Sequence, residues 1–119
     1  MKTYKEVYQF PLRLAKYDSW VYDEKSNFVF QFEIINKEKR QLLLDVINGE
    51  KKLNNSDAVF HHKDGYILTD KGVEVILIRG WGNLTGIGAM NLSGEEAANI
   101  QDTFAEFIVE QLNKRDVVQ

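Results

Sequence analysis

The sequence of 119 residues contains no cysteine, and this absence excludes several kinds of chemistry. Without thiols the chain cannot form disulfides, thiolate zinc sites or iron–sulfur clusters, and it has no cysteine nucleophile. Proline is also scarce, with a single residue at Pro11. The composition is still that of a folded protein, since 44% of the residues are hydrophobic and 12% are aromatic. We expect one globular domain over residues 1–119.

The chain also lacks long apolar runs and an excess of basic residues. Even the longest unbroken apolar stretches are short, such as Val75 to Ile78, and lie far below the ~20 residues that span a bilayer. The first residues do not form the apolar core of a signal peptide, so we expect a cytoplasmic protein without a membrane partner. The net charge is −3, and residues 91–119 carry 2 Lys or Arg against 6 Asp or Glu. This balance argues against nucleic acid as a partner and leaves weak nucleic-acid binding as an alternative.

Alternating apolar and polar residues predict an antiparallel sheet of about five to six strands. The segments that show this pattern or end at turn signals are residues 3–10, 20–22, 27–35, 58–62, 66–69 and 73–79. Residues 12–16 fit either a continued strand or a helical turn. Asp64-Gly65 is a strong hairpin turn signal, and the polar residues 23–27 and 70–72 supply two further turns.

Two amphipathic helices complete the expected fold. Asn36 is placed to cap a helix over residues 37–48 that Gly49 ends, and Ser93 with Glu96 forms the pattern of a capping box before a helix of about 95–113. The chain then contains two hairpin-plus-helix units, residues 20–49 and 58–114. We therefore predict an α+β fold, with both helices packed on one face of one antiparallel sheet.

One resemblance to known proteins rests on the first of these units. It carries Trp20-Val21-Tyr22-Asp23, then Asn27-Phe28-Val29-Phe30, and a helix that ends with Val46-Ile47-Asn48-Gly49. This arrangement, over about a quarter of the chain, resembles small proteins of phages and mobile elements. Such proteins share no known activity, so the resemblance implies an accessory or host-interaction role and assigns no site residue.

Residues 80–94 hold five of the eight glycines and lie between a predicted strand and the last helix. The spacing Gly80-x-Gly82-x-x-x-Gly86 is not that of a dinucleotide fingerprint, and the Gly-Lys-Ser/Thr of a Walker loop is missing. Glutamates open the following helix and would repel a phosphate there. Two interpretations remain: a glycine-permitted cover for the sheet, or a recognition surface that presents Arg79, Trp81, Asn83 and Thr85.

Three further patterns also allow both a structural and a functional interpretation. The last helix has an acidic face with Asp102, Glu106 and Glu110, which is either a solvated face or a surface for a basic partner. His61 and His62 are adjacent in a predicted strand, so they point to opposite faces and predict no metal site. The alternating Phe28, Phe30 and Phe32 indicate one row on one face, which favours core packing over stacking on bases.

These patterns contain no coherent catalytic set, no metal ligands and no phosphate cradle, so we expect no catalytic residue and no cofactor. We predict a small non-enzymatic interaction module that binds a protein partner or associates with itself. The candidate interaction residues are Arg79, Trp81, Asn83, Thr85, Asp102, Glu106 and Glu110. The alternative is a small-ligand binder or enzyme that uses the loop of residues 80–94.

Overall fold

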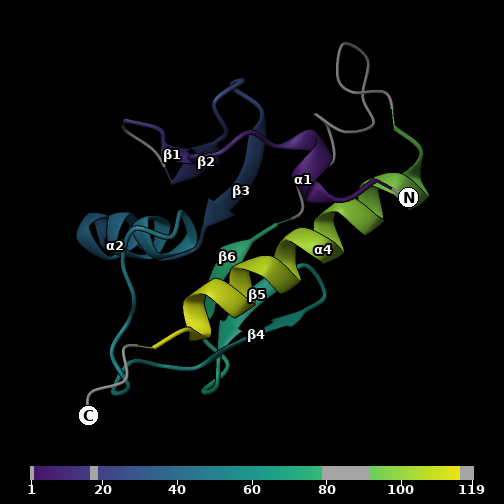
Figure 1. Ribbon diagram of the computed structural model, residues 1–119. Helices are drawn as coiled ribbons and strands as arrows, with labels where there is room; N and C mark the ends of the chain where they lie inside the picture. The colour runs from purple at the N-terminus through teal and green to yellow at the C-terminus, as the bar shows by residue number, and fades with distance from the viewer. Residues whose placement is uncertain (1, 17–18, 79–91, 116–119) are drawn as a thin grey trace.

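The computed structural model describes residues 2–16, 19–78 and 92–115, and its elements are shown in Figure 1. The helices are α1 (Tyr4–Val7), α2 (Lys37–Ile47) and α4 (Gly94–Asn113). The strands are β1 (Arg13–Leu14), β2 (Trp20–Tyr22), β3 (Phe28–Phe32), β4 (Phe60–Lys63), β5 (Tyr66–Thr69) and β6 (Glu74–Leu77). The predicted α+β class is confirmed.

The six strands form one antiparallel sheet in the order β1-β2-β3-β6-β5-β4. In this order the two three-stranded halves join edge to edge: β3 pairs with β6 in the centre, and β1 and β4 form the outer edges. At the central junction Gln31 pairs with Leu77 and Phe32 with Ile76. Each half is followed in the chain by one long helix, so the two units form a continuous sheet of 3 + 3 strands.

The helix boundaries follow the capping residues. Asn36 accepts a hydrogen bond from the backbone N–H of Lys39, and Ser93 accepts one from Glu96. Gly49 follows the C-cap Asn48 of α2 and has a left-handed φ of +81°, and Glu50 N–H donates to the carbonyl of Asp45 across the helix end. This is the pattern of a Schellman cap, which glycine forms without the cost of a side chain.

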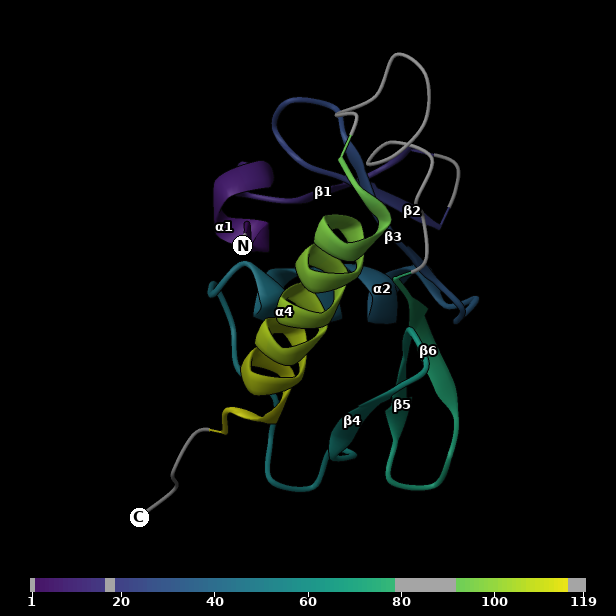
Figure 2. The ribbon, with the colours of Figure 1, turned by 90° about the vertical axis from the view of Figure 1, so that its right-hand side faces the viewer.

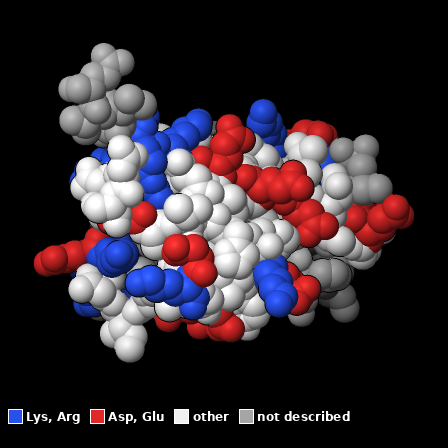
Figure 3. Space-filling view, turned by 90° about the horizontal axis from the view of Figure 1, so that it is seen from below, with Lys and Arg blue, Asp and Glu red and all other residues white. Residues whose placement is uncertain are grey.

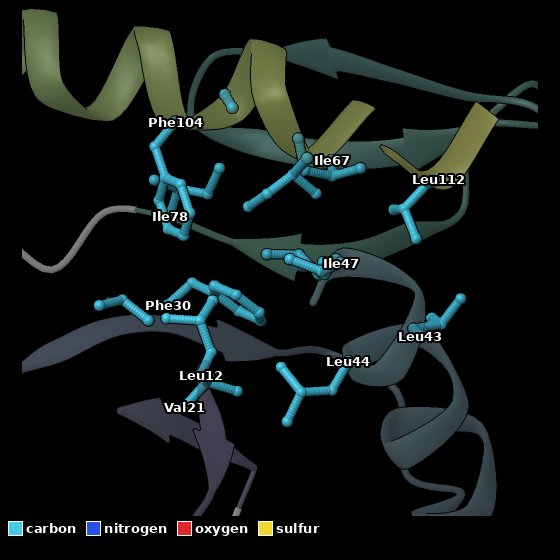
Figure 4. Packing of buried hydrophobic residues seen from close by; sticks show 14 of the residues in the cluster. Leu12, Val21, Phe30, Leu43, Leu44, Ile47, Ile67, Ile78, Phe104 and Leu112 are labelled. Atoms are coloured by element: carbon cyan, nitrogen blue, oxygen red, sulfur yellow. The ribbon is translucent and has the colours of Figure 1, made fainter. Parts of the chain in front are cut away.

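The hydrophobic core lies between the sheet and the two long helices, and Figure 4 shows side chains from both units meeting there. Phe30 of β3 and Phe104 of α4 are fully buried, with ring centroids 6.0 Å apart. Ile47 of α2, Ile67 of β5 and Ile76 of β6 are also fully buried. Figure 2 shows α4 and α2 beside the strands, and the core that they share joins the two halves of the sheet.

The first predicted strand, over residues 3–10, is wrong, because residues Tyr4–Val7 form α1 and residues 8–10 belong to no strand. The partial alternation of its aromatic residues arises from packing on α4. Tyr4 stacks on Phe107 with centroids 4.9 Å apart, and Tyr8 lies 5.1 Å from Phe104. The sequence does contain a helix signal here, since Glu6 follows Thr3 at capping-box spacing and Thr3 N–H donates to the Glu6 carboxylate.

The prediction that three phenylalanines share a face is also wrong, because a β-bulge interrupts β3. Val21 pairs with Phe30 but Tyr22 pairs with Phe28, which leaves Val29 as the extra residue. The ring of Phe28 consequently lies against Trp20 and Tyr22, with centroids 5.1 and 6.1 Å away. Because Trp20 and Tyr22 alternate with the core residue Val21, Phe28 lies on the face opposite Phe30.

The turn between β2 and β3 is built around one buried carboxylate. Asp23 has no exposed surface, and its two oxygens accept four hydrogen bonds. The donors are the backbone N–H groups of Gln9, Lys25 and Asn27 and the side-chain amide of Asn27. The carboxylate therefore fixes the turn and ties it to the segment that links α1 to β1.

Both edges of the sheet are held by an asparagine from the end of a helix. Asn48, after α2, accepts from Leu12 N–H at 2.8 Å and donates to the Leu12 carbonyl at 2.9 Å, just before β1. Asn113, at the end of α4, makes the same two bonds to Phe60 of β4, both at 2.9 Å. An unpaired edge can recruit another strand, so these amides occupy backbone groups that would otherwise be open to pairing.

Candidate functional site

The acidic face of α4 is the part of the predicted site that the structure describes. Asp102, Glu106 and Glu110 are all exposed and four residues apart, which places them along one side of the helix. The opposite side carries the buried core residues. Figure 3, seen from below, shows acidic side chains mainly over the right of the molecule and basic ones mainly over the left. Arg79, Trp81, Asn83 and Thr85 lie outside the described residues.

A groove between α1 and α4 adjoins two of these carboxylates. α1 is held on α4 by two bonds: Tyr4 N–H donates to Thr103 Oγ1 at 3.4 Å, and the Asn99 amide donates to the carbonyl of Lys2 at 2.7 Å. The groove has a volume of about 290 Å³. Its lining residues are Thr3, Tyr4, Lys5, Thr103, Glu106, Phe107 and Glu110.

The floor of this groove is aromatic and its rim is acidic. The ring of Phe107 is half-buried and stacks on Tyr4, with an interplanar angle of 29°. Burial raises the pKa of the Tyr4 hydroxyl, and the negative charge of Glu110 raises it further. Tyr4 therefore stays neutral at physiological pH. A neutral aromatic surface beside carboxylates suits a cationic side chain with an apolar stem.

Neither rim glutamate has a partner among the described residues. Lys51 forms an ion pair with Asp45, at 3.4 Å, and this pair involves no residue of α4. Lys5 also lines the groove, but two carboxylates face this single cation. The groove thus offers negative charge that the fold itself does not neutralise.

The described residues offer little for metal or nucleophilic chemistry. Across residues 2–16, 19–78 and 92–115 no group of three His, Asp or Glu side chains is placed to hold a metal ion. His61 pairs with Leu68 and His62 with Ile67, so the two imidazoles lie on opposite faces of β4, as their adjacency predicts. The Nε2 of His62 accepts from Gly65 N–H at 3.2 Å and so serves the turn.

The helical spacing of Glu106 and Glu110 predicts two of the groove's residues. The sequence does not predict its aromatic floor or the wall that α1 forms. Tyr4 and Phe107 are 103 residues apart and lie at one surface only because α1 packs on α4. The Thr3-x-x-Glu6 spacing could have indicated α1, but no local pattern places that helix against the last one. Buried Asp23 was recognised as a turn residue and not as a hub of hydrogen bonds.

Comparison of the chain with protein-family models, with curated proteins and with solved structures finds no match. The resemblance to small proteins of phages and mobile elements therefore stays a prediction. Among the described helices, none combines the length and the apolar character that crossing a bilayer requires.

Proposed function

We propose that this protein is a small non-enzymatic interaction module whose α1–α4 groove binds a basic segment of a protein partner. The observation that carries the proposal is the pair of unpartnered glutamates, Glu106 and Glu110, that line the same groove as the half-buried ring of Phe107. Exposed carboxylates that the fold leaves unpaired remain available to lysine or arginine from outside. The aromatic floor adds apolar contact and cation–π attraction.

A solvated acidic face would explain the charge of α4 without any partner. It does not explain why the ring of Phe107 remains partly exposed in the groove that the two carboxylates line. Phe and Tyr are enriched at protein interfaces relative to the remaining surface, and the polar groups of an interface lie mainly at its rim. The groove is open to solvent along its length and does not enclose its contents, which favours an extended peptide segment as the occupant.

Binding of a fluorescein-labelled nonapeptide of alternating lysine and glycine, followed by anisotropy, tests the proposal. We expect the double variant Glu106→Gln/Glu110→Gln to bind about fivefold more weakly, because exposed ion pairs contribute roughly 0.2–1 kcal/mol each. The matched control is Glu24→Gln/Glu74→Gln, which removes the same charge from exposed sites elsewhere. An equal loss in both variants would show that only net charge matters and would refute the groove.

A further inference from the structure

A second cleft lies on the other side of α4, apart from the α1–α4 groove. It has a volume of about 300 Å³ and is bounded by the β4–β5 turn, the residue after β6 and the first half of α4. Its lining residues are His62, Asp64, Gly65, Ile78, Ala98, Gln101 and Asp102. This volume is at the lower end of the range of small-molecule sites, roughly 300–1,000 Å³.

The side chain of Gln101 is the unusual group in this cleft. It is only 8% exposed, and its Nε2 has no hydrogen-bond partner among the described residues. By contrast, the side-chain amides of Asn48 and Asn113 each make two hydrogen bonds to backbone. A buried amide donor without an acceptor destabilises a fold, so its presence calls for an acceptor that arrives from outside.

Gln101 can present this donor to the cleft without repacking the core. Gln101 is one of the residues that line the cleft, and the terminal torsion of glutamine is broad, so rotation of the amide can turn an N–H toward the open space. The ligand atom that meets it must be an acceptor, and a carbonyl oxygen is the natural choice. Gly65, Ala98 and Ile78 contribute small or apolar wall next to it.

The remaining polar groups of the cleft indicate which charge the rest of the ligand should carry. Asp64 and Asp102 are exposed at the cleft and neither side chain has a partner among the described residues. The imidazole of His62 accepts from Gly65 N–H through Nε2, so in its neutral form the proton is on Nδ1. Two carboxylates disfavour an anion and attract an ammonium group.

We infer that this cleft binds an α-amino amide, in which an ammonium group and a carbonyl oxygen are carried on adjacent carbons. The ammonium lies toward Asp64 and Asp102, and the carbonyl accepts from Gln101 Nε2. The same chemistry occurs in a small amino-acid amide and at the free amino terminus of a peptide. The inference is independent of the α1–α4 groove, because Glu106 and Glu110 take no part in it.

Titration of the ¹⁵N-labelled full chain with alaninamide, followed by amide chemical shifts, tests this inference. We expect saturable shifts at residues 62–65 and 98–102. N-acetylalaninamide lacks the ammonium and isopropylamine lacks the carbonyl, and each is expected to bind at least about tenfold more weakly. Alanylalaninamide separates the two sources: tighter binding than alaninamide indicates a peptide amino terminus, and weaker binding indicates a small amide.

Two variants distinguish binding from a structural role. Gln101→Leu keeps the volume but removes the donor, so we expect the urea midpoint to be unchanged or higher and alaninamide affinity to fall about tenfold. Asp102→Asn, which is exposed, is expected to weaken alaninamide with no change in the midpoint. Gln41→Leu on the exposed side of α2 is the matched control and should leave affinity unchanged.

The inference is overturned if alaninamide produces no saturable shifts, or if Gln101→Leu binds it as well as the wild type. A lower urea midpoint for Gln101→Leu would also overturn it, because the amide would then serve the fold itself. Equal binding of N-acetylalaninamide would remove the role of the two aspartates.

Discussion

At the scale of single residues, the buried carboxylate of Asp23 is the group that holds the β2–β3 turn together. Each of its carboxylate oxygens accepts two hydrogen bonds, and all four donors lie in the β2–β3 turn or in the segment after α1. Asparagine in its place would turn an NH₂ group toward two of these donors. We expect Asp23→Asn to lower the free energy of unfolding by about 2–4 kcal/mol.

Urea unfolding measures this effect, and Glu24→Gln is the control because Glu24 is exposed in the same turn. The control should change stability by less than about 0.5 kcal/mol. If Asp23→Asn were as stable as the wild type, the carboxylate could not be the hub of the turn.

Tyr8 gives a prediction for alkaline pH. Burial raises the pKa of its hydroxyl well above the ordinary value of 10.0, and the nearby charge of Asp23 raises it further. The folded state therefore holds this proton more tightly than the unfolded state. This contribution to stability is fully present below pH 10 and is lost as the pH rises above it.

We expect the Tyr8→Phe variant to lose less stability than the wild type between pH 9 and pH 11, as measured by urea midpoints across that range. The variant has no hydroxyl to ionise, so its curve should be flatter above about pH 10. Identical slopes for the two proteins would contradict a raised pKa of the Tyr8 hydroxyl in the folded state.

At the scale of secondary-structure elements, the ends of α2 and α4 do more than terminate helices. Asn48 follows α2 and Asn113 ends α4, and each holds backbone at the edge of its own half of the sheet. Replacing Asn113 by leucine removes both bonds to Phe60 and uncovers the β4 edge. We expect Asn113→Leu to destabilise the fold by about 1–3 kcal/mol and to increase self-association.

Urea unfolding and light scattering at several protein concentrations test this prediction. Asn55→Leu, at an exposed position in the loop between α2 and β4, is the matched control and should change neither property. If Asn113→Leu remained as stable and as monodisperse as the control, the asparagine would not protect the edge.

Elements with a local signal were predictable from the sequence, and those set by distant contacts were not. Asn36, Ser93 and Gly49 marked the helix ends, and Asp64-Gly65 marked a turn in which both residues adopt positive φ, 51° and 85°. α1 is a single turn of helix, too short to show a period, and its packing on α4 supplies its stability. The bulge at Val29 moved Phe28 to the other face, which alternation alone could not reveal.

The candidate site likewise contains some residues that local spacing predicts and others that only distant contacts bring together. Helical spacing was enough to place Asp102, Glu106 and Glu110 on one side of α4, whereas the Tyr4–Phe107 floor depends on contacts between the two ends of the chain. Gln101 gave no signal at all, because a glutamine beside an apolar stripe is ordinary in a helix. Its missing partner becomes visible only in three dimensions.

At the scale of the whole molecule, the two units share one sheet and one core. β3 pairs with β6 at the centre, and α2 contacts α4 across the junction. Neither half can bury its central strand alone, so we expect one cooperative unfolding transition. Native-state hydrogen exchange should give Phe30 and Ile67, which are fully buried in different units, the same opening free energy. A difference above about 1 kcal/mol would show that the halves unfold separately.

If the α1–α4 groove binds a basic segment, such a segment must contact the residues that line it. Mapping where the segment binds tests this most directly. The ¹⁵N-labelled chain is titrated with the lysine–glycine nonapeptide, and amide shifts are followed residue by residue. We expect saturable shifts concentrated at residues 3–7 and 103–110, with an affinity about fivefold lower in Glu106→Gln/Glu110→Gln. Small, unsaturable shifts spread over exposed Asp and Glu across the molecule would contradict it.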